Sequence, residues 1–284
     1  MMRGCNSLIH FNKYTVTKSF DDIEESYNEI LVNKMIIGNN DFCCIGLNQY
    51  YDVVNNTNNY VIIMNRMKCD LYDLHCIDKM CLIKLIVDVL SSIKYLHKYM
   101  ITHADIHERN IMYDDIQNKF VIIDFGECLI VKNSNKYTPS FMHDIFEFGC
   151  TLSRIILRKI DIPDVGEFRY YNEILNNLET LSNMFGHNVI NAILNMVKCI
   201  DERLYISDLL KIVNNEKKNI TSSLNNNVLE YHSNIIFDVV PDIYINERKD
   251  IIYDFRNIGG RKNYIYNNYC KYFSENNVLL HLIK

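Results

Sequence analysis

The sequence predicts an α+β fold in which a small N-terminal region of strands precedes a larger region of helices. β-branched and aromatic residues concentrate near the N-terminus, at residues 14–17 and 60–64, as is typical of strands. Residues 78–98 carry apolar side chains at intervals of three and four, which indicates a buried helix. Helical spacing continues in shorter segments over residues 151–212.

The elements before the long helix follow in the order strand, helix, strand, strand. Extended structure is predicted for residues 5–20, and a helix begins near Asp21 and ends at Gly38. Two further strands are expected over residues 42–51 and 60–64, joined by an Asn-rich turn.

Three short polar side chains stand among apolar residues in the middle of the chain, namely Asp105, Asn110 and Asp124. Phosphoryl transfer from a nucleotide needs a metal ion held by hard oxygen ligands, which Asp and Asn supply. It also needs a carboxylate beside the incoming hydroxyl group, to orient it and accept its proton. These three residues are therefore candidates for such a site.

A predicted hairpin explains how these side chains meet. Residues 121–123 indicate a buried strand, so Asp124 projects from the strand end into a turn opened by Gly126. The charged residues within 101–112 predict a loop that runs into a short strand, and residues 114–119 are rich in turn formers. The two segments would then lie side by side.

The His-x-Asp-x-x-x-x-Asn pattern of residues 103–110 resembles the catalytic loop of protein kinases, and Asp-Phe-Gly at 124–126 resembles their metal-binding triplet. The two motifs occur in the order typical of that family, and residues 103–110 are called the catalytic loop from here on. The resemblance implies that Asp105 is the catalytic base, that Asn110 is a metal ligand and that Asp124 is the main metal ligand. ATP and Mg²⁺ are the implied cofactors.

The resemblance covers residues 8–212 and implies a two-lobed fold of the eukaryotic-type protein kinase superfamily. A reduced N-terminal β lobe is expected at residues 1–67, and a mainly helical C-terminal lobe at 68–212. Residues 213–284 form an extension of unknown role, which a polar linker at 214–227 would open.

The same resemblance assigns the nucleotide-binding residues. Lys18 is the phosphate-binding lysine and Glu29 its partner on the helix, although Lys13 competes with Lys18 for this role because the spacing of Lys18 to Glu29 is short. Met64 corresponds to the residue at the back of the adenine pocket, and Met67 lies in the hinge that follows.

The phosphate-binding flap departs from the family pattern. Such a flap needs two strands and a glycine-rich turn before the lysine strand. Residues 1–12 offer one strand, Gly4 is the only glycine there, and the chain contains no G-x-G-x-x-G. Nucleotide binding therefore rests on fewer contacts than usual, which leaves open a weak or inactive kinase.

The catalytic loop also departs from the commonest pattern. Ala104 stands where an arginine often pairs with a phosphorylated activation loop, and His107 stands where a lysine often reaches the transferred phosphate. The resemblance makes His107 a catalytic residue, and a histidine there also occurs in haspin-like and small-molecule kinases. Residues 127–142 are too few for a long activation loop, as in compact atypical kinases of the RIO type.

Two further residues match structural positions of the family. Asp144 corresponds to the helix residue that ties back to the catalytic loop, and Arg203 corresponds to a buried arginine near the end of the large lobe. The glutamate that normally pairs with that arginine is missing, so Arg203 is expected to pair elsewhere or to be exposed.

Composition sets the remaining expectations. The chain has 284 residues, a net charge of −5 and ten cysteines without a C-x-x-C pair, which predicts a cytosolic protein that binds neither nucleic acid nor membrane. Abundant Asn, Ile and Tyr are typical of an AT-rich genome, such as that of a large DNA virus or a parasite. A viral protein would act in the host cytoplasm. The oligomeric state is left open.

Three functions are weighed. The leading one is an ATP-dependent phosphotransferase that acts on Ser/Thr hydroxyls of a protein substrate, with a small-molecule kinase as a less favoured form. The alternative is a pseudokinase that acts as a binding module. A third interpretation treats His103, Asp105 and His107 as a Zn²⁺ cluster of a hydrolase.

Overall fold

The structure is a computed structural model, and it describes residues 2–3, 8–13, 15–20, 29, 32, 50–53, 60–74, 77–130 and 139–225. The chain divides into two compact units, Met1–Lys217 and Lys218–Lys284. The predicted α+β fold is confirmed, with an antiparallel sheet in the N-terminal region followed mostly by helices.

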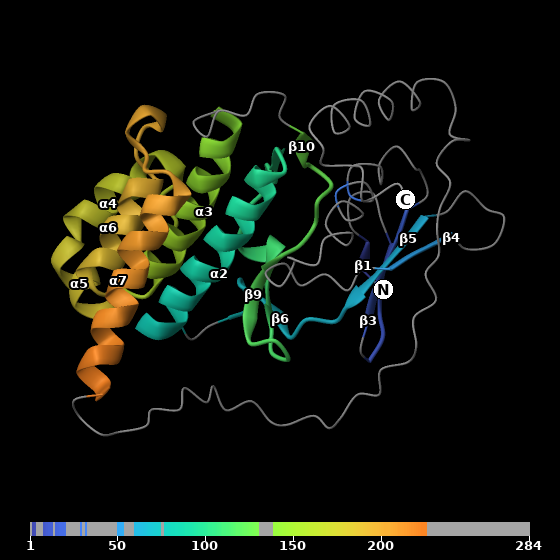
Figure 1. Ribbon diagram of the computed structural model, residues 1–284, viewed down its shortest axis with the longest axis horizontal. Coiled ribbons are helices and arrows are strands. Elements are labelled where there is room, and N and C mark those ends of the chain that lie inside the picture. The colour runs from blue at the N-terminus through green and yellow to red at the C-terminus, as the bar shows by residue number, and fades with distance from the viewer. Residues whose placement is uncertain are drawn as a thin grey trace. The chain divides into compact units, whose positions relative to one another are not determined.

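The N-terminal sheet has five antiparallel strands in the order β1-β2-β3-β5-β4 (Figure 1). Its strands are β1 (Met2–Arg3), β2 (Leu8–Phe11), β3 (Thr15–Phe20), β4 (Tyr50–Val53) and β5 (Tyr60–Asn65). In the register of β3 and β5, Lys18 lies opposite Ile62 and Val16 lies opposite Met64. Because residues directly opposite one another share a face, Lys18, Ile62 and Met64 lie on the same face of the sheet.

Residues 1–12 form β2 and, in addition to the single flap-length strand expected there, the two-residue strand β1. Strand β1 escaped detection because two residues carry no alternation to read. The predicted pairing of β4 with β5 is confirmed, whereas residues 42–49 and the turn at 54–59 lie outside the described residues. Of the predicted helix after Asp21, only Glu29 and Val32 are described, and both are helical and buried.

Helix α2 (Lys79–Lys98) coincides with the predicted buried helix. The carboxylate of Asp78 caps its first turn by accepting a hydrogen bond from the Cys81 N–H at 2.7 Å. Leu82, Ile86 and Leu90 are completely buried, as their helical spacing predicts. The helix packs against β9, so it supports the hairpin described next (Figure 1).

The middle of the chain forms short strands around the catalytic loop. Strands β6 (Cys69–Asp70), β8 (Ile111–Asp114) and β9 (Lys119–Ile122) make one sheet, and β7 (Ile101–Thr102) pairs with β10 (Leu129–Ile130). The β8–β9 hairpin confirms the sequence prediction, with Asp114 opposite Lys119. A short 3₁₀ helix, η1 (Glu108–Asn110), leads into β8.

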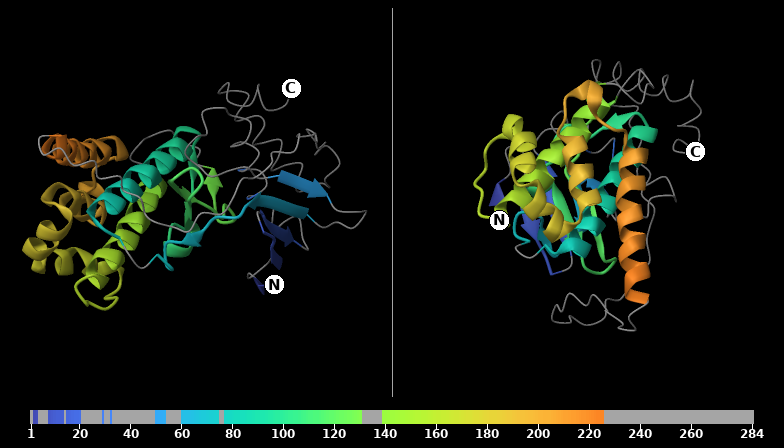
Figure 2. Two further views of the ribbon diagram at one scale, coloured as in Figure 1. Left: turned by 90° about the horizontal axis from the view of Figure 1, so that it is seen from below. Right: turned by 90° about the vertical axis from the view of Figure 1, so that its left-hand side faces the viewer.

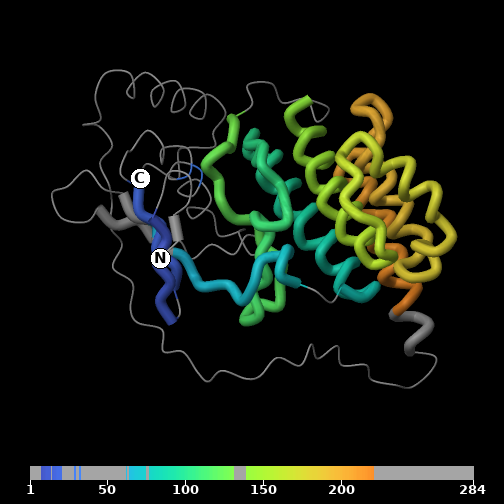
Figure 3. Tube along the Cα trace, turned by 180° about the vertical axis from the view of Figure 1, so that it is seen from behind, coloured from blue at the N-terminus to red at the C-terminus, as the bar shows by residue number. Residues whose placement is uncertain are grey.

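The remaining helices are α3 (Pro139–Arg158), α4 (Tyr170–Asn176), α5 (Leu178–Phe185), α6 (His187–Met196) and α7 (Ile206–Asn225), with short 3₁₀ turns η2 (Glu167–Arg169) and η3 (Ile200–Glu202). Figure 2 and Figure 3 show the N-terminal sheet on one side of the β8–β9 hairpin and helices α3–α6 on the other. Helices α3 and α6 approach closely at Gly149, where an added Cβ would lie 2.6 Å from Met196 Cβ.

The predicted linker at residues 214–227 is wrong as far as Asn225, because α7 continues through it. The segment is polar, but α7 buries Ile206, Leu209 and Val213 on one side, and its Glu216 binds Lys79 at 2.7 Å. The polar side chains among residues 214–220 therefore lie toward the solvated side of a packed helix. Helix α7 crosses the expected boundary between residues 212 and 213, and the division into two lobes and an extension stays a prediction.

Within the part of the chain that the structure describes, no helix combines the length and the apolar character needed to cross a bilayer.

Candidate active site

The β8–β9 hairpin brings the two polar segments together. Ile111 lies opposite Ile122, and the Ile123 N–H donates to the Asn110 carbonyl at 2.9 Å, which extends the pairing to the residue before Asp124. On the other side, Asn110 Nδ2 donates to Asp105 Oδ2 at 2.8 Å and to the Asp105 carbonyl at 3.0 Å. The amide oxygen of Asn110 is therefore the atom left for a cation.

Lys18 joins this region to the N-terminal sheet. Its Nζ lies 2.8 Å from Glu29 Oε2 and 2.9 Å from Asp124 Oδ1. The structure thus brings Lys18 to Glu29 and Asp124, while its competitor Lys13 is exposed in the turn between β2 and β3. The choice between the two lysines depends on this tertiary contact, which spacing along the sequence does not reveal.

The charged groups of Lys18, Glu29 and Asp124 differ in their exposure to solvent. Burial by itself lowers the pKa of Lys18, but the carboxylates of Glu29 and Asp124 outweigh it and leave the pKa above its ordinary value. Burial raises the pKa of Glu29 to about 7, against the opposing effect of Lys18. The ammonium group of Lys18 thus contacts the carboxylates of Glu29 and Asp124, and a further carboxylate, that of Asp105, lies beside Asn110.

Of the predicted adenine-side residues, the strand register relates Met64 to Lys18. Met64 shares a face of the sheet with Lys18 and with the completely buried Ile62, and Lys18 Nζ lies 5.2 Å from the centre of the Phe20 ring. Met67 is buried just after β5. Apolar side chains thus adjoin the ammonium group of Lys18.

His107 lies beside the proposed base. Its Nδ1 accepts a hydrogen bond from the Arg109 N–H at 3.1 Å, which caps η1, and its Nε2 lies 3.5 Å from Asp105 Oδ2. Both side chains are partly open to water, with 40% of His107 and 43% of Asp105 exposed. His107 can therefore reach a group bound next to Asp105.

His103 has a different environment. The ring is completely buried, its Nε2 lies 3.0 Å from the Ile123 carbonyl, and burial lowers its pKa, so the neutral form is favoured. It therefore supports the turn before Asp124. In the described ranges, no group of three or more His, Cys, Asp or Glu side chains is placed to hold a metal ion, so the zinc-cluster interpretation is not supported.

Asp144 has the role expected of it. Its carboxylate accepts hydrogen bonds from the N–H groups of His103 at 3.0 Å and Ala104 at 2.9 Å, and it lies 2.8 Å from His97 Nε2. Ala104 has a φ of +61°, in the left-handed region that disfavours side chains by about 1–2 kcal/mol. Asp144 stabilises the catalytic loop in this strained conformation.

Comparison with known proteins agrees with this geometry. Residues 11–146 match the family model of the protein kinase domain. This part of the chain is therefore similar to a eukaryotic-type protein kinase domain. The chain is also similar to the serine/threonine-protein kinase ELM1 of Saccharomyces cerevisiae, with 23% identity over 175 residues. The alignment covers 47% of this chain and 27% of the yeast protein's length, so the chain spans only part of that relative.

Arg203 lies C-terminal to the matched part of the kinase domain and is half-buried. Its guanidinium donates to the carbonyls of Lys198 at 2.6 Å and Met142 at 3.0 Å, and it stacks over the Phe146 ring at 4.3 Å. The expectation that Arg203 pairs elsewhere is confirmed, because it binds one backbone carbonyl near the start of α3 and one just after α6.

Sequence analysis missed a second set of residues in contact with the catalytic loop. Glu108 is buried and binds arginines of α3, and Glu147 accepts a hydrogen bond from the Ile106 N–H at 3.1 Å. Polar residues of α3 recur at intervals of three and four, which places them on one helix face. This α3 polar stripe consists of Asp144, Glu147, Thr151, Arg154 and Arg158. The spacing of these polar residues in the sequence is the signal that could have predicted the stripe.

Proposed function

We propose that the kinase domain transfers phosphate from ATP to serine or threonine hydroxyl groups of proteins, with Mg²⁺ as cofactor. The observation that carries the proposal is the contact of Lys18 with both Glu29 and Asp124. This contact joins strand β3, a buried helical residue and the turn after β9 in one group of charges, next to Asp105 and Asn110.

The donor set fits a divalent metal ion. Asp124 and Asn110 offer hard oxygen atoms, and the carboxylate of Asp105 lies beside Asn110. Bound Mg²⁺ neutralises charge on the phosphate groups. Asp124 and Asn110 would hold it, while Lys18 would bind phosphate oxygen atoms through the ammonium group that now faces the two carboxylates.

The catalytic loop supplies the groups for proton transfer. Asp105 would orient the acceptor hydroxyl and take its proton, with its carboxylate held by Asn110 Nδ2 at 2.8 Å. His107, with Nε2 3.5 Å from the same carboxylate, would donate a hydrogen bond to the transferred phosphate. Asp105 would thus supply a base, and His107 would supply a hydrogen-bond donor to the transferred phosphate beside it.

A protein substrate is favoured over a small molecule by the similarity to a yeast serine/threonine-protein kinase. A second candidate function is a binding module that holds a nucleotide or a partner without transferring phosphate. It is favoured by the flap, in which β1 has only two residues and the sequence contains no G-x-G-x-x-G. Asp105, Asn110 and Asp124 oppose it, because folding alone does not require all three.

The nucleotide site is tested by calorimetric titration of purified protein with Mg·ATP. Lys18→Met should weaken the affinity about tenfold or more, because a charge-assisted contact to phosphate is lost. Lys13→Met is the matched control, with the same loss of charge on the exposed side of the β2–β3 turn, and should bind like the wild type. No Mg·ATP binding by the wild type, or equal loss in both variants, would contradict the proposal.

The second candidate is distinguished with the same protein preparation. An active kinase labels serine or threonine residues of acceptor proteins when γ-labelled ATP is supplied. A binding module retains Mg·ATP affinity that depends on Lys18 but labels no acceptor.

A further inference from the structure

The α3 polar stripe contacts the catalytic loop residue by residue. Near the start of the helix, Asp144 binds the backbone of His103 and Ala104. One and two turns later, the Glu147 carboxylate accepts from the Ile106 N–H at 3.1 Å, and the Thr151 hydroxyl donates to the Ile106 carbonyl at 3.3 Å. The order of contacts along the helix therefore follows the order of residues along the loop.

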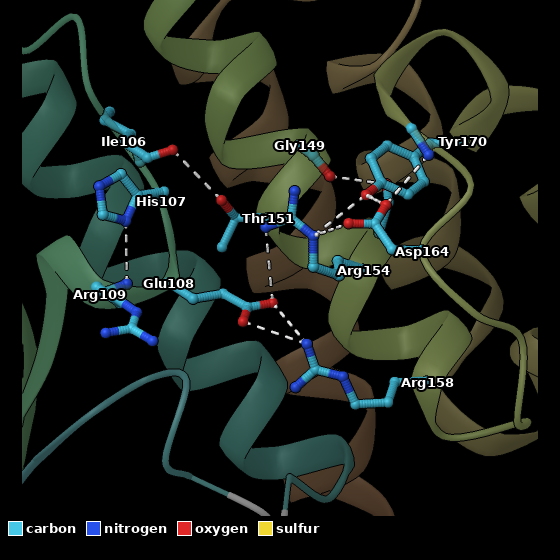
Figure 4. A network of polar contacts seen from close by, with 12 residues as sticks. Ile106, His107, Glu108, Arg109, Gly149, Thr151, Arg154, Arg158, Asp164 and Tyr170 are labelled. Atoms are coloured by element: carbon cyan, nitrogen blue, oxygen red, sulfur yellow. Dashed lines mark hydrogen bonds and ion pairs between the residues drawn. The ribbon is translucent and has the colours of Figure 1, made fainter.

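The last contact of the α3 polar stripe with the catalytic loop joins side chains, whereas the earlier contacts are made to the loop backbone. Arg158 Nη2 lies 3.1 Å from Glu108 Oε1 and 3.2 Å from Glu108 Oε2, and Arg154 Nη1 lies 3.9 Å from Oε1 (Figure 4). Arg154 is itself held from the other side, because its Nε donates to Asp164 at 3.0 Å and to the Tyr170 hydroxyl at 3.2 Å. A chain of charged contacts thus runs from the catalytic loop to the start of α4.

Glu108 also has a central place in the local backbone. It is the first residue of η1, and its carbonyl accepts a hydrogen bond from the Leu71 N–H at 3.1 Å. Asn110 is the last residue of the same turn, and its N–H donates to the His107 carbonyl at 3.0 Å. A rotation of Glu108 would therefore move Asn110, whose side chain binds Asp105.

We propose that Glu108 is a positioning residue: its carboxylate, bound by Arg158 and Arg154 of α3, fixes the turn that holds Asn110 against Asp105. Its effect on phosphate transfer rests on the proposed function, whereas the positioning itself does not. Both partners of the contact belong to the chain, and Ala104 carries no charge that could bind a phosphorylated residue. The contact of Glu108 with α3 therefore involves no phosphorylated residue.

The burial of Glu108, Arg154 and Arg158 determines which substitution tests the positioning role of Glu108. Glu108 has 4% of its side chain exposed, whereas Arg154 has 28% and Arg158 has 51%. Removing both arginines would strand a buried carboxylate, which threatens the fold. Glu108→Gln instead leaves partly solvated arginines, keeps the shape of the side chain and replaces one acceptor oxygen by a donor that faces a guanidinium.

The experiment measures amide hydrogen exchange in the full chain. In Glu108→Gln, amides of residues 108–111 should exchange about tenfold or more faster, while those of α6 keep their wild-type rates. The Mg²⁺ concentration needed for half-maximal turnover should rise, and turnover should fall about a hundredfold, as expected for a displaced catalytic group. Glu108→Asp, which keeps the charge, should recover part of both effects.

Lys211→Ala is the matched control, because it removes the cation of an exposed ion pair with Asp208 on α7 and should change neither measurement. Should Glu108→Gln fail to fold, Arg158→Lys keeps the charge with a single donor group and should accelerate exchange at the same amides. Wild-type exchange at residues 108–111 in the folded variant would overturn the inference. Faster exchange in a protein whose wild type transfers no phosphate would contradict only the proposed function.

Discussion

At Lys18, one ammonium group faces two carboxylates of very different burial. Glu29 has 1% of its side chain exposed and Asp124 has 43%. Asp124 is partly solvated, whereas the buried Glu29 carboxylate is desolvated and Lys18 opposes the resulting rise in its pKa. Glu29 is therefore the group of the site whose protonation near neutral pH is linked to folding.

The pKa of Glu29, raised from 4.5 to about 7 by burial, predicts a pH-dependent stability. Between these values the folded protein holds a proton that the unfolded chain has released, so the contribution of Glu29 to stability falls as the pH rises through this window. The wild type should lose about 1–3 kcal/mol relative to Glu29→Gln between pH 5 and 8. Urea unfolding of both proteins across this range measures the difference.

Glu216→Gln is the control for this series. Hydrogen bonding to Lys79 lowers the pKa of Glu216, so its stabilisation is present above its unfolded pKa and is lost only at more acidic pH. The difference between the wild type and this variant should stay constant from pH 5 to 8. A constant difference for Glu29→Gln as well would contradict the assignment of Glu29 as a buried titrating group.

Asp144 accepts three contacts in a fully buried position, so its removal should affect stability strongly. Asp144→Asn replaces one acceptor oxygen by a donor facing other donors, and should lower the free energy of unfolding by about 3 kcal/mol. Asp208→Asn on the surface of α7 should change it by less than about 0.5 kcal/mol. Equal stability of the two variants in chemical denaturation would contradict the role of Asp144.

At the scale of elements, α3 uses two faces for different purposes. Its polar stripe binds the catalytic loop, and Gly149 allows α6 to approach closely. An added Cβ at Gly149 would lie 2.6 Å from Met196 Cβ and 3.1 Å from the Met196 carbonyl carbon, which cannot move without α6. The helix thus holds the loop against a tightly packed helical layer.

Gly149→Ala therefore tests packing against helix propensity. Alanine gains about 1 kcal/mol of intrinsic helix stability over glycine, but overpacking at a close helix contact costs about 1–3 kcal/mol. We expect a net loss of thermal stability. Asn183→Ala on the exposed side of α5 has the propensity gain alone and should be neutral or stabilising. A gain in stability for Gly149→Ala would show that α3 and α6 can separate freely.

The elements that the sequence predicts well are those with a local pattern. Helix α2 has a long apolar stripe with a capping aspartate, and the β8–β9 hairpin has strand residues around a turn. Strand β1 is too short for a pattern, and the part of α7 after residue 213 was mistaken for a linker because it is rich in Lys and Asn. Pattern analysis therefore fails where length or polarity hides the packed side.

Within the candidate site, too, some residues have a local sequence pattern and others do not. Asp105, Asn110 and Asp124 are recognisable because their spacing along the chain is itself the motif. The selection of Lys18 and the burial of Glu108 depend on contacts 106 and 50 residues away, respectively, so no local signal marks them. Such contacts become visible only when the helices and strands are assembled.

At the scale of the whole molecule, the match to the protein kinase domain ends at residue 146, inside α3. Beyond it, α3 continues to provide the residues that contact the catalytic loop, and α6 packs on its other face. Helix α3 thus links the helical region to the site, through its hydrogen bonds to the catalytic loop and its close packing against α6. The division into lobes at residues 1–67 and 68–212 and an extension at 213–284 remains a proposal.

The most direct measurement is single-turnover transfer of γ-phosphate from preformed Mg·ATP complex to serine- and threonine-containing acceptor proteins. Wild type should transfer phosphate. Asp105→Asn removes the base but keeps an amide oxygen that can accept from Asn110 Nδ2, so it should bind Mg·ATP and transfer phosphate at least about a hundredfold more slowly. Asp115→Asn in the exposed turn of the β8–β9 hairpin should transfer like the wild type. Nucleotide-saturated wild type that labels no acceptor, or equal transfer by Asp105→Asn, would contradict a protein kinase that uses this site.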